Sequence, residues 1–142
     1  MAQGLKVAVD LTNQKVRFTG AARANPPVTF DYDPPLGDGQ GYTGLEMLLM
    51  SLAACSATAI VALLRKMGKS VGGFHVNARG TRRETHPTSF DKIFLEFVVT
   101  SSDAGEADVK KAIQLSEESV CPVWAMLKGN VEIQVEFRIM KP

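Results

Sequence analysis

The pattern of apolar and polar positions predicts one long helix between two regions of β-strand. Residues 44–67 are almost wholly apolar and carry no charge after Glu46 until their last turn. Thr43 and Glu46 have the spacing of a capping box, in which each side chain bonds the backbone N–H of the other residue. Gly68 follows as a residue suited to a left-handed helix end. We therefore expect a helix over 44–67 that is buried on all sides.

The same stretch has an alternative interpretation as a membrane span, because its length is at the lower edge of what crosses a bilayer. The middle of the stretch, residues 51–59, consists of serine, alanine, cysteine and threonine. Such small side chains let another backbone come close but contribute little to membrane affinity. The composition therefore favours a soluble, buried helix over a membrane helix.

Strands are predicted on both sides of this helix by alternating apolar positions. The first two strands can form a hairpin, and prolines place the third at a sheet edge. Two further helices are expected: a longer one opened by a second capping-box spacing at Asp103 and Glu106, and a short one that starts at Pro122. The predicted strands are 5–9, 14–20, 26–32, 73–80, 91–100 and 131–139, and the further helices are 103–119 and 121–128. This order predicts an α+β fold in which an antiparallel or mixed sheet packs on the central helix.

Length and charge narrow the function without identifying it. A chain of 142 residues suggests a single domain over 1–142 with a substantial core. The net charge is +1 and no basic run is present, so we expect neither a nucleic-acid partner nor a membrane surface. No apolar signal segment opens the chain, which favours a cytoplasmic location.

The two cysteines are the main candidates for chemistry. Cys121 directly precedes Pro122 at a predicted helix start, where free N–H groups and the helix dipole should lower the pKa of a thiol. Cys55 lies in the middle of the apolar helix, where the surroundings favour the neutral thiol. The residues alone therefore rank Cys121 as the better nucleophile. The alternative is that both are small buried apolar residues, as free cysteines usually are.

Other candidate groups give weaker signals. His75 and His86 show no metal-ligand spacing with the cysteines, so we expect no metal site. Arginines could activate a thiol, although a solvated arginine is the default for each of them. The candidates are Arg17, Arg23, Arg79, Arg82 and Arg83.

The two cysteine segments together resemble the osmotically inducible protein C (OsmC) family, which includes the organic hydroperoxide resistance enzymes. They are Glu46–Cys55 and Ser119–Val123, and the likeness runs from about Gly41 to the C-terminus. The segment Gly80–Leu95 is similar to a less-characterised OsmC-like branch. The resemblance implies an OsmC-like α+β fold with about six strands, a long central helix and two further helices. It also implies an intertwined homodimer with two active sites near its interface.

The resemblance implies a thiol-dependent peroxidase that reduces organic hydroperoxides, and it reverses our ranking of the thiols. Cys55 would attack the peroxide and become a sulfenic acid, and Cys121 would condense with it to a disulfide. An external dithiol would then reduce that disulfide, so no bound cofactor is expected. An N-terminal arginine would hold the reactive thiolate, and Arg17 is our choice.

One position departs from the family pattern. The well-studied peroxidases carry a glutamate one residue further from the reactive cysteine than Glu46, at the position of Leu45 here. We therefore expect Glu46 to cap the helix and not to serve in catalysis. This departure favours the alternative function, a non-enzymatic OsmC-like dimer that binds a small molecule or senses redox state.

Overall fold

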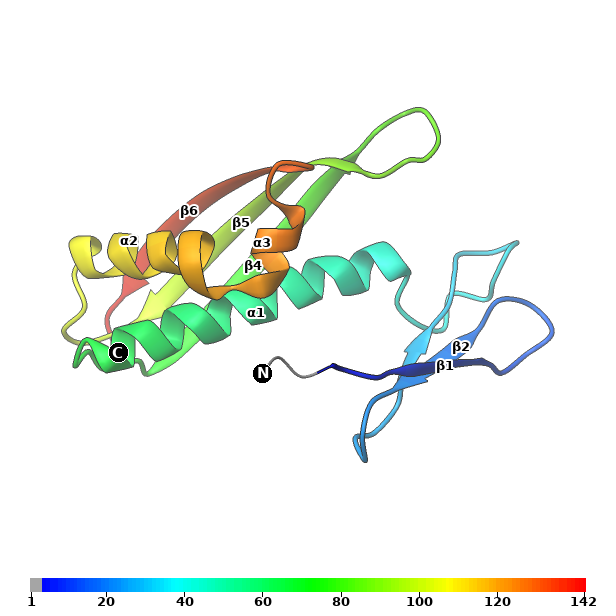
Figure 1. The fold of residues 1–142 in the computed structure, drawn as a ribbon, viewed down its shortest axis with the longest axis horizontal. Helices are drawn as coiled ribbons and strands as arrows, with labels where there is room; N and C mark the ends of the chain where they lie inside the picture. The colour runs from blue at the N-terminus through cyan, green and yellow to red at the C-terminus, as the bar shows by residue number, and fades with distance from the viewer. Residues whose placement is uncertain (1–3) are drawn as a thin grey trace. The chain divides into compact units, whose positions relative to one another are not determined.

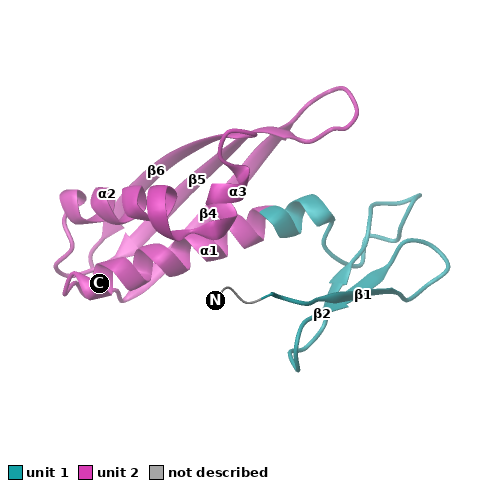
Figure 2. Cartoon of the chain, in the orientation of Figure 1, with its two compact units in different colours: residues 1–48 teal, residues 49–142 magenta. Residues whose placement is uncertain are grey.

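The computed structural model describes residues 4–142, which form two compact units with their boundary after Leu48 (Figure 2). Unit 1 ends at Leu48 and unit 2 runs from Leu49 to Pro142. The first residues of the N-terminal segment, on which the cytoplasmic prediction depends, lie outside the described part of the chain.

Unit 1 contains a small antiparallel sheet with the strand order β1-β2-β3. Its strands are β1 (Ala8–Leu11), β2 (Phe18–Ala21) and β3 (Val28–Phe30). The expected hairpin and the expected edge position of the third strand are both confirmed. The strands are shorter than predicted and begin later, since the segment around Asn13 bends instead of pairing.

A buried carboxylate organises the loop that follows β3. The side chain of Asp31 is fully buried and accepts hydrogen bonds from the backbone N–H groups of Tyr32 (2.8 Å), Gln40 (3.0 Å) and Asp38 (3.4 Å). The Nε atom of Arg17 lies 3.4 Å from Asp31 Oδ2. The N–H of Gln40 foremost, then those of Tyr32 and Asp38, hold the pKa of Asp31 below its ordinary value, against the opposing effect of burial.

Unit 2 contains a mixed sheet with the strand order β4-β5-β6. Its strands are β4 (Gly73–Arg82), β5 (Phe90–Thr100) and β6 (Glu132–Met140). The β4–β5 pair is antiparallel and the β5–β6 pair is parallel. The expected α+β class and about six strands are confirmed, and among residues 4–142 the six strands form two three-stranded sheets.

The helices cover one face of the β4-β5-β6 sheet (Figure 1). They are α1 (Gly44–Lys66), α2 (Glu106–Leu115), a π-helical turn (Ser116–Val120) and α3 (Pro122–Leu127). The strand predicted over 91–100 from alternating apolar positions is β5, and its alternate residues are buried: Ile93, Leu95, Phe97 and Val99. This single-sided packing leaves the opposite face of the sheet to polar side chains.

Both predicted ends of α1 are confirmed. The Thr43 N–H donates to Glu46 Oε1 (2.9 Å), and the Glu46 N–H donates to Thr43 Oγ1 (3.2 Å), which is the capping box. Gly68 ends the helix with φ of 81°, a backbone conformation that favours glycine. The prediction and the observation agree because both helix ends are determined by residues that are neighbours in the sequence.

The expectation that α1 is buried on all sides is wrong for the single chain. Its fully or nearly buried residues recur at helical spacing on one face: Leu52, Ser56, Ala59, Ile60 and Leu64. Among the described helices, α1 alone is long and apolar enough to cross a membrane, yet a core helix of a soluble protein passes the same test. The helix therefore keeps an uncovered apolar side, because unit 2 supplies packing partners for only one face.

The start of α2 also differs from the prediction. The helix begins at Glu106 and not at Asp103, and Asp108 Oδ2 accepts the N–H of Gly105 (2.9 Å) at its first turn. Asp103 is engaged elsewhere, since its Oδ1 accepts the N–H of Ser70 (2.9 Å). That hydrogen bond is the main reason why the pKa of Asp103 lies below its ordinary value. Asp103 therefore binds Ser70, a residue from a distant part of the chain, instead of capping α2.

We predict that Asp31→Asn lowers the midpoint of thermal unfolding at neutral pH. Because folding lowers the pKa of Asp31, its stabilisation is present above the ordinary value of 3.8 and is lost as the pH falls through the lower folded value. The difference from the native chain should therefore shrink in acid, which calorimetry across pH can measure. Asp33→Asn, at an exposed position of the same loop, is the control and should change little. A difference that stays constant into strong acid would contradict this role.

Candidate functional site

The sulfur of Cys121 is the N-terminal cap of α3. Cys121 has extended backbone angles, Pro122 takes the first helical position, and Cys121 Sγ accepts the backbone N–H of Trp124 at 3.4 Å. The N–H of Cys121 in turn donates to the carbonyl of Ser116 (2.9 Å). The predicted short helix is confirmed, and both backbone bonds fix the thiol at its start.

The two thiols differ in their access to solvent. Both cysteines are free, and Cys121 is 2% exposed whereas Cys55 is partly exposed in the middle of α1. Trp124, the single tryptophan of the chain, is 1% exposed beside Cys121. A reagent can therefore reach Cys55 more readily than Cys121.

Folding brings the two thiols together from distant parts of the chain. Cys121 interacts with the thiol of Cys55 and with the hydroxyl of Ser56, the next residue of α1. Burial foremost raises the pKa of the Cys121 thiol, and Cys55 raises it further, while the Trp124 N–H and Ser56 act in the opposite direction. The expectation that the helix start lowers the pKa of Cys121 is therefore wrong, because loss of solvent outweighs the N–H groups.

Two features next to Cys121 escaped the sequence analysis. The expected α-helix up to Ser119 changes into a π-helical turn at Ser116, a change for which the sequence carries no signal that we can identify. Ser116 Oγ is buried and has no hydrogen-bond partner among residues 4–142. The contact of Ser56 with Cys121 was also missed. The sequence signal that could have indicated it is Ser56 itself, a polar residue directly after Cys55 in an apolar helix.

Arg17 and Glu46 lie in unit 1 and have partners there. Arg17, whose side chain is 31% exposed, contacts Asp31 through Nε and Asp38 through Nη2, each at 3.4 Å. Glu46 is held in the capping box with Thr43. Leu45 stands where the well-studied peroxidases carry a glutamate, so this position has no carboxylate here. The role of Arg17 toward a thiolate stays a prediction.

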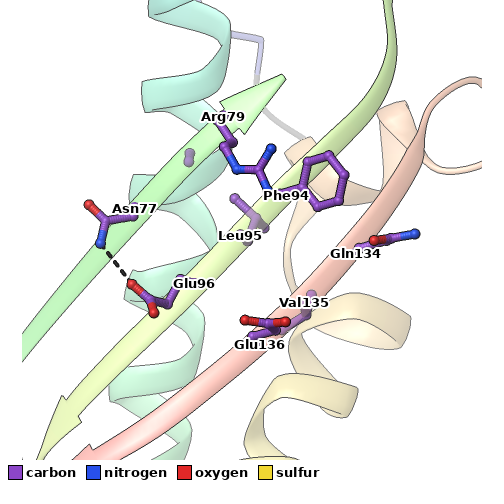
Figure 3. Close-up of a pocket in the computed structure, with 9 residues that line it drawn as sticks. Asn77, Arg79, Phe94, Leu95, Glu96, Gln134, Val135 and Glu136 are labelled. Carbon is purple, nitrogen blue, oxygen red and sulfur yellow. Dashed lines mark hydrogen bonds between the residues drawn. The ribbon is translucent and has the colours of Figure 1, made fainter. Parts of the chain in front are cut away.

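A groove of about 700 Å³ lies on the open face of the β4-β5-β6 sheet, away from the helices (Figure 3). Asn77 Nδ2 donates to Glu96 Oε1 (2.8 Å) within it, and the guanidinium of Arg79 lies 4.0 Å from the centroid of the Phe94 ring. The lining residues include no cysteine. We therefore place the candidate site at the thiols and not in this groove.

The side chains near the thiols limit the chemistry they can perform. No group of three or more His, Cys, Asp or Glu side chains that could hold a metal ion occurs among the described residues. What unit 2 does bring together is one partly exposed thiol, one buried thiol and a buried hydroxyl. Such a pair of thiols can be oxidised to a disulfide and reduced again by thiol exchange.

Comparison with known proteins identifies one family. The family described as OsmC-like protein matches residues 37–136. Protein YhfA of Escherichia coli is 36% identical over 96 residues, which are 68% of this chain and 72% of YhfA. The residues that the family model matches include both Cys55 and Cys121.

Solved structures share the fold at lower sequence identity. A hypothetical protein from Aquifex aeolicus superposes with a TM-score of 0.87 at 23% identity, over 99% of both chains. The organic hydroperoxide resistance protein OhrB of Bacillus subtilis has a TM-score of 0.62 at 16% identity, over 96% of this chain and 98% of OhrB. At these identities the likeness shows the fold alone.

We predict that a small alkylating reagent modifies Cys55 about tenfold faster than Cys121 in the reduced, folded protein. The reason is that Cys121 is nearly inaccessible and its raised pKa leaves little thiolate. Mass spectrometry of peptides after timed treatment with iodoacetamide measures both rates. In urea the two rates should converge, and faster labelling of Cys121 in the folded state would contradict the assignment.

Proposed function

Because the chain belongs to the OsmC-like protein family, we propose that it is a thiol-dependent peroxidase that reduces organic hydroperoxides. The observation that carries this proposal is the electrostatic interaction between Cys55 and Cys121, two free thiols of unequal exposure. Proteins with the same fold include organic hydroperoxide resistance proteins, among them OhrB. These likenesses support the reaction class, and the thiol pair supplies the groups for it.

The proposed cycle uses each thiol once. The Cys55 thiolate attacks the terminal oxygen of the hydroperoxide, the O–O bond breaks, and the alkoxide leaves and takes a proton from solvent to become an alcohol. Cys55 is then a sulfenic acid. Cys121 attacks its sulfur, an S–S bond forms, and the hydroxyl leaves as water with the Cys121 proton. An external dithiol restores both thiols by exchange.

The unequal environments support this division of roles. A hydroperoxide must reach the attacking sulfur, and Cys55 is the partly exposed thiol. Cys121 is buried and its pKa is raised, so it is poorly suited to the first attack. Cys121 is better suited to the second step, in which it attacks the sulfenic acid formed at Cys55.

A cation is the missing part of the proposed site, and we propose Arg17 for it. An arginine near Cys55 would stabilise the thiolate by charge. Arg17 is bound by Asp31 and Asp38 in unit 1, which orients its guanidinium but also balances its charge.

We propose that the protein works as a cytoplasmic homodimer. The side of α1 that unit 2 leaves uncovered is mostly apolar, and such a surface is usually covered by a partner. A second copy would cover it with the same face in a two-fold arrangement. Residues of α1 along this side include Ala57, Thr58, Val61, Ala62 and Arg65, and Phe74 of β4 lines the same hollow.

The alternative function is a non-enzymatic dimer that binds a small molecule or senses redox state. Two observations favour it: Glu46 is used as a helix cap, and Arg17 is paired with two carboxylates. Glu46 and Arg17 are therefore engaged elsewhere, which leaves fewer polar groups that could stabilise a thiolate at Cys55. Turnover of hydroperoxide by the reduced protein separates the two functions.

We predict that one equivalent of cumene hydroperoxide converts the reduced protein to a form with a Cys55–Cys121 disulfide. Digestion without reductant followed by mass spectrometry detects the linked peptides, and loss of peroxide is followed in parallel. Cys55→Ser should abolish peroxide loss, while Cys121→Ser should leave a sulfenic acid at Cys55 that dimedone traps.

The outcomes of this experiment are distinct. No linked peptide and no loss of peroxide would reject the peroxidase in favour of the alternative. Full peroxide consumption by Cys55→Ser would overturn the assignment of roles.

We predict that Thr58→Arg weakens the homodimer, because it adds a charge to the apolar side of α1. Light scattering coupled to size exclusion should give twice the mass of a single chain for the native protein and a lower average mass for the variant. Gln114→Arg, at an exposed position of α2, is the matched control and should stay dimeric. A native protein that runs as a monomer would refute the dimer.

A further inference from the structure

Ion pairs between neighbouring strands organise the open face of the β4-β5-β6 sheet. Lys92 Nζ of β5 lies 3.3 Å from Glu132 Oε2 of β6, and Arg138 Nε of β6 lies 3.7 Å from Glu96 Oε2 of β5. Glu96 also accepts a hydrogen bond from Asn77 Nδ2 of β4 (2.8 Å). These charges on the open face therefore compensate one another across the strands.

Two charges that line the groove on this face are exceptions. The guanidinium of Arg79 rests on the Phe94 ring, and the side chains of Arg79 and Glu136 have no ion-pair or hydrogen-bond partner among residues 4–142. The two charges are opposite, yet they do not bond each other. In Figure 3, Arg79 lies beside Phe94 at one end of the groove, and Glu136 lies near Glu96 at the other. The groove therefore offers a binding group of each sign to a third molecule.

Arg79 is oriented to bind a carboxylate. A guanidinium that stacks on an aromatic ring keeps its N–H groups in its own plane, where they can bind both oxygens of a carboxylate. The guanidinium carbon lies 4.0 Å from the centroid of the Phe94 ring, and this contact orients the group without using any of its donors. A carboxylate that binds there therefore requires little rearrangement of Arg79.

Glu136 is suited to bind an ammonium group. It is the register partner of Glu96 on the adjacent strand, so two carboxylates are neighbours on this face. Like charges in such a position repel each other. Arg138 and Asn77 compensate Glu96 but not Glu136. A cationic group bound at Glu136 would therefore relieve this repulsion.

The spacing of the two groups limits the size of a molecule that can bridge them. Because Arg79 reaches over Phe94, its charge lies over β5, one strand and one row of side chains from Glu136. A strand spacing of about 4.8 Å and a rise of about 3.3 Å per residue place these positions roughly 8 Å apart. The carboxylate and ammonium of a free amino acid, with a hydrogen bond of about 2.9 Å at each end, span such a distance. The groove volume of about 700 Å³ leaves room for a side chain.

We propose that this groove is a binding site for a free α-amino acid, in which Arg79 binds the carboxylate and Glu136 binds the ammonium group. An amino acid compensates both unpaired charges at once, which neither an anion nor a cation alone can do. The inference goes beyond the proposed peroxidase and does not depend on it, since the residues that line the groove include neither cysteine.

Heteronuclear NMR of the full-length protein tests the site with defined probes. L-leucine and L-glutamine carry both charges, N-acetyl-L-leucine lacks the ammonium charge, and L-leucinamide lacks the carboxylate. We expect millimolar L-leucine to shift the backbone signals of the three strands where they line the groove, at 77–79, 94–96 and 134–136. The two single-charge analogues should bind about tenfold more weakly, because each loses a hydrogen-bonded charge pair.

Substitutions assign each charge to its partner. Arg79→Gln and Glu136→Gln should each weaken the binding of L-leucine about tenfold. Arg79→Gln should also weaken N-acetyl-L-leucine and spare L-leucinamide, and Glu136→Gln should do the reverse. Arg82→Gln and Glu132→Gln are the matched controls, since they change the same residue types on β4 and β6 outside the groove lining. Both controls should bind L-leucine as the native protein does, and thermal unfolding shows that each variant is folded.

The contrary outcomes are distinct. No shift in the groove with either amino acid would mean that solvent alone satisfies the two charges, and would overturn the site. Equal binding of L-leucine and its single-charge analogues, or an equal loss in the control variants, would also overturn it. Groove signals that move with protein concentration alone would assign this face to a second copy of the chain, against the proposal. Hydroperoxide turnover by the same native protein tests the proposed function separately.

Discussion

The site depends on one constraint: the sulfur that caps α3 is buried against α1. Cys121 starts the helix by accepting the Trp124 N–H, and its own N–H closes the π-helical turn at Ser116. Cys55 and Ser56 of α1 both influence the pKa of the same sulfur. A single atom therefore takes part in a helix cap, in the packing of two helices and in the candidate chemistry, so a change at Cys121 affects all three.

Burial of that sulfur also explains the contrast between the thiols. Isolated at a helix start, a thiol would gain acidity from free N–H groups. In the core the loss of solvent is the larger effect, and the pKa of Cys121 rises. The partly exposed Cys55 is left as the thiol that external molecules can meet. This arrangement matches the order of events in the proposed cycle, in which the buried thiol acts second.

Sequence reasoning succeeded where the signal is local. The capping box at Thr43 and Glu46, the left-handed Gly68 and the helix start at Pro122 each depend on a few neighbouring residues. Alternating patterns likewise predicted the inward side of β5. The resemblance of the cysteine segments identified the OsmC-like family before the fold was known, and the match over residues 37–136 confirms it.

Reasoning failed where the outcome depends on tertiary contacts. The composition of α1 does not indicate that unit 2 covers only one face of the helix. The spacing of Asp103 and Glu106 suggested a helix cap, but Asp103 accepts the N–H of Ser70 instead. The raised pKa of Cys121 and its contact with Ser56 require knowledge of which helices pack together. Both depend on residues that lie far apart in the chain.

The central claim is that Cys55 and Cys121 form one redox site, and an equilibrium redox titration tests it most directly. Protein equilibrated in dithiothreitol buffers of graded potential would be followed by Trp124 fluorescence and by alkylation of free thiols. The account predicts a single two-electron transition in which both thiols disappear together, with a midpoint independent of protein concentration. Thiols that stay free across the range, or a midpoint that moves with protein concentration, would contradict it.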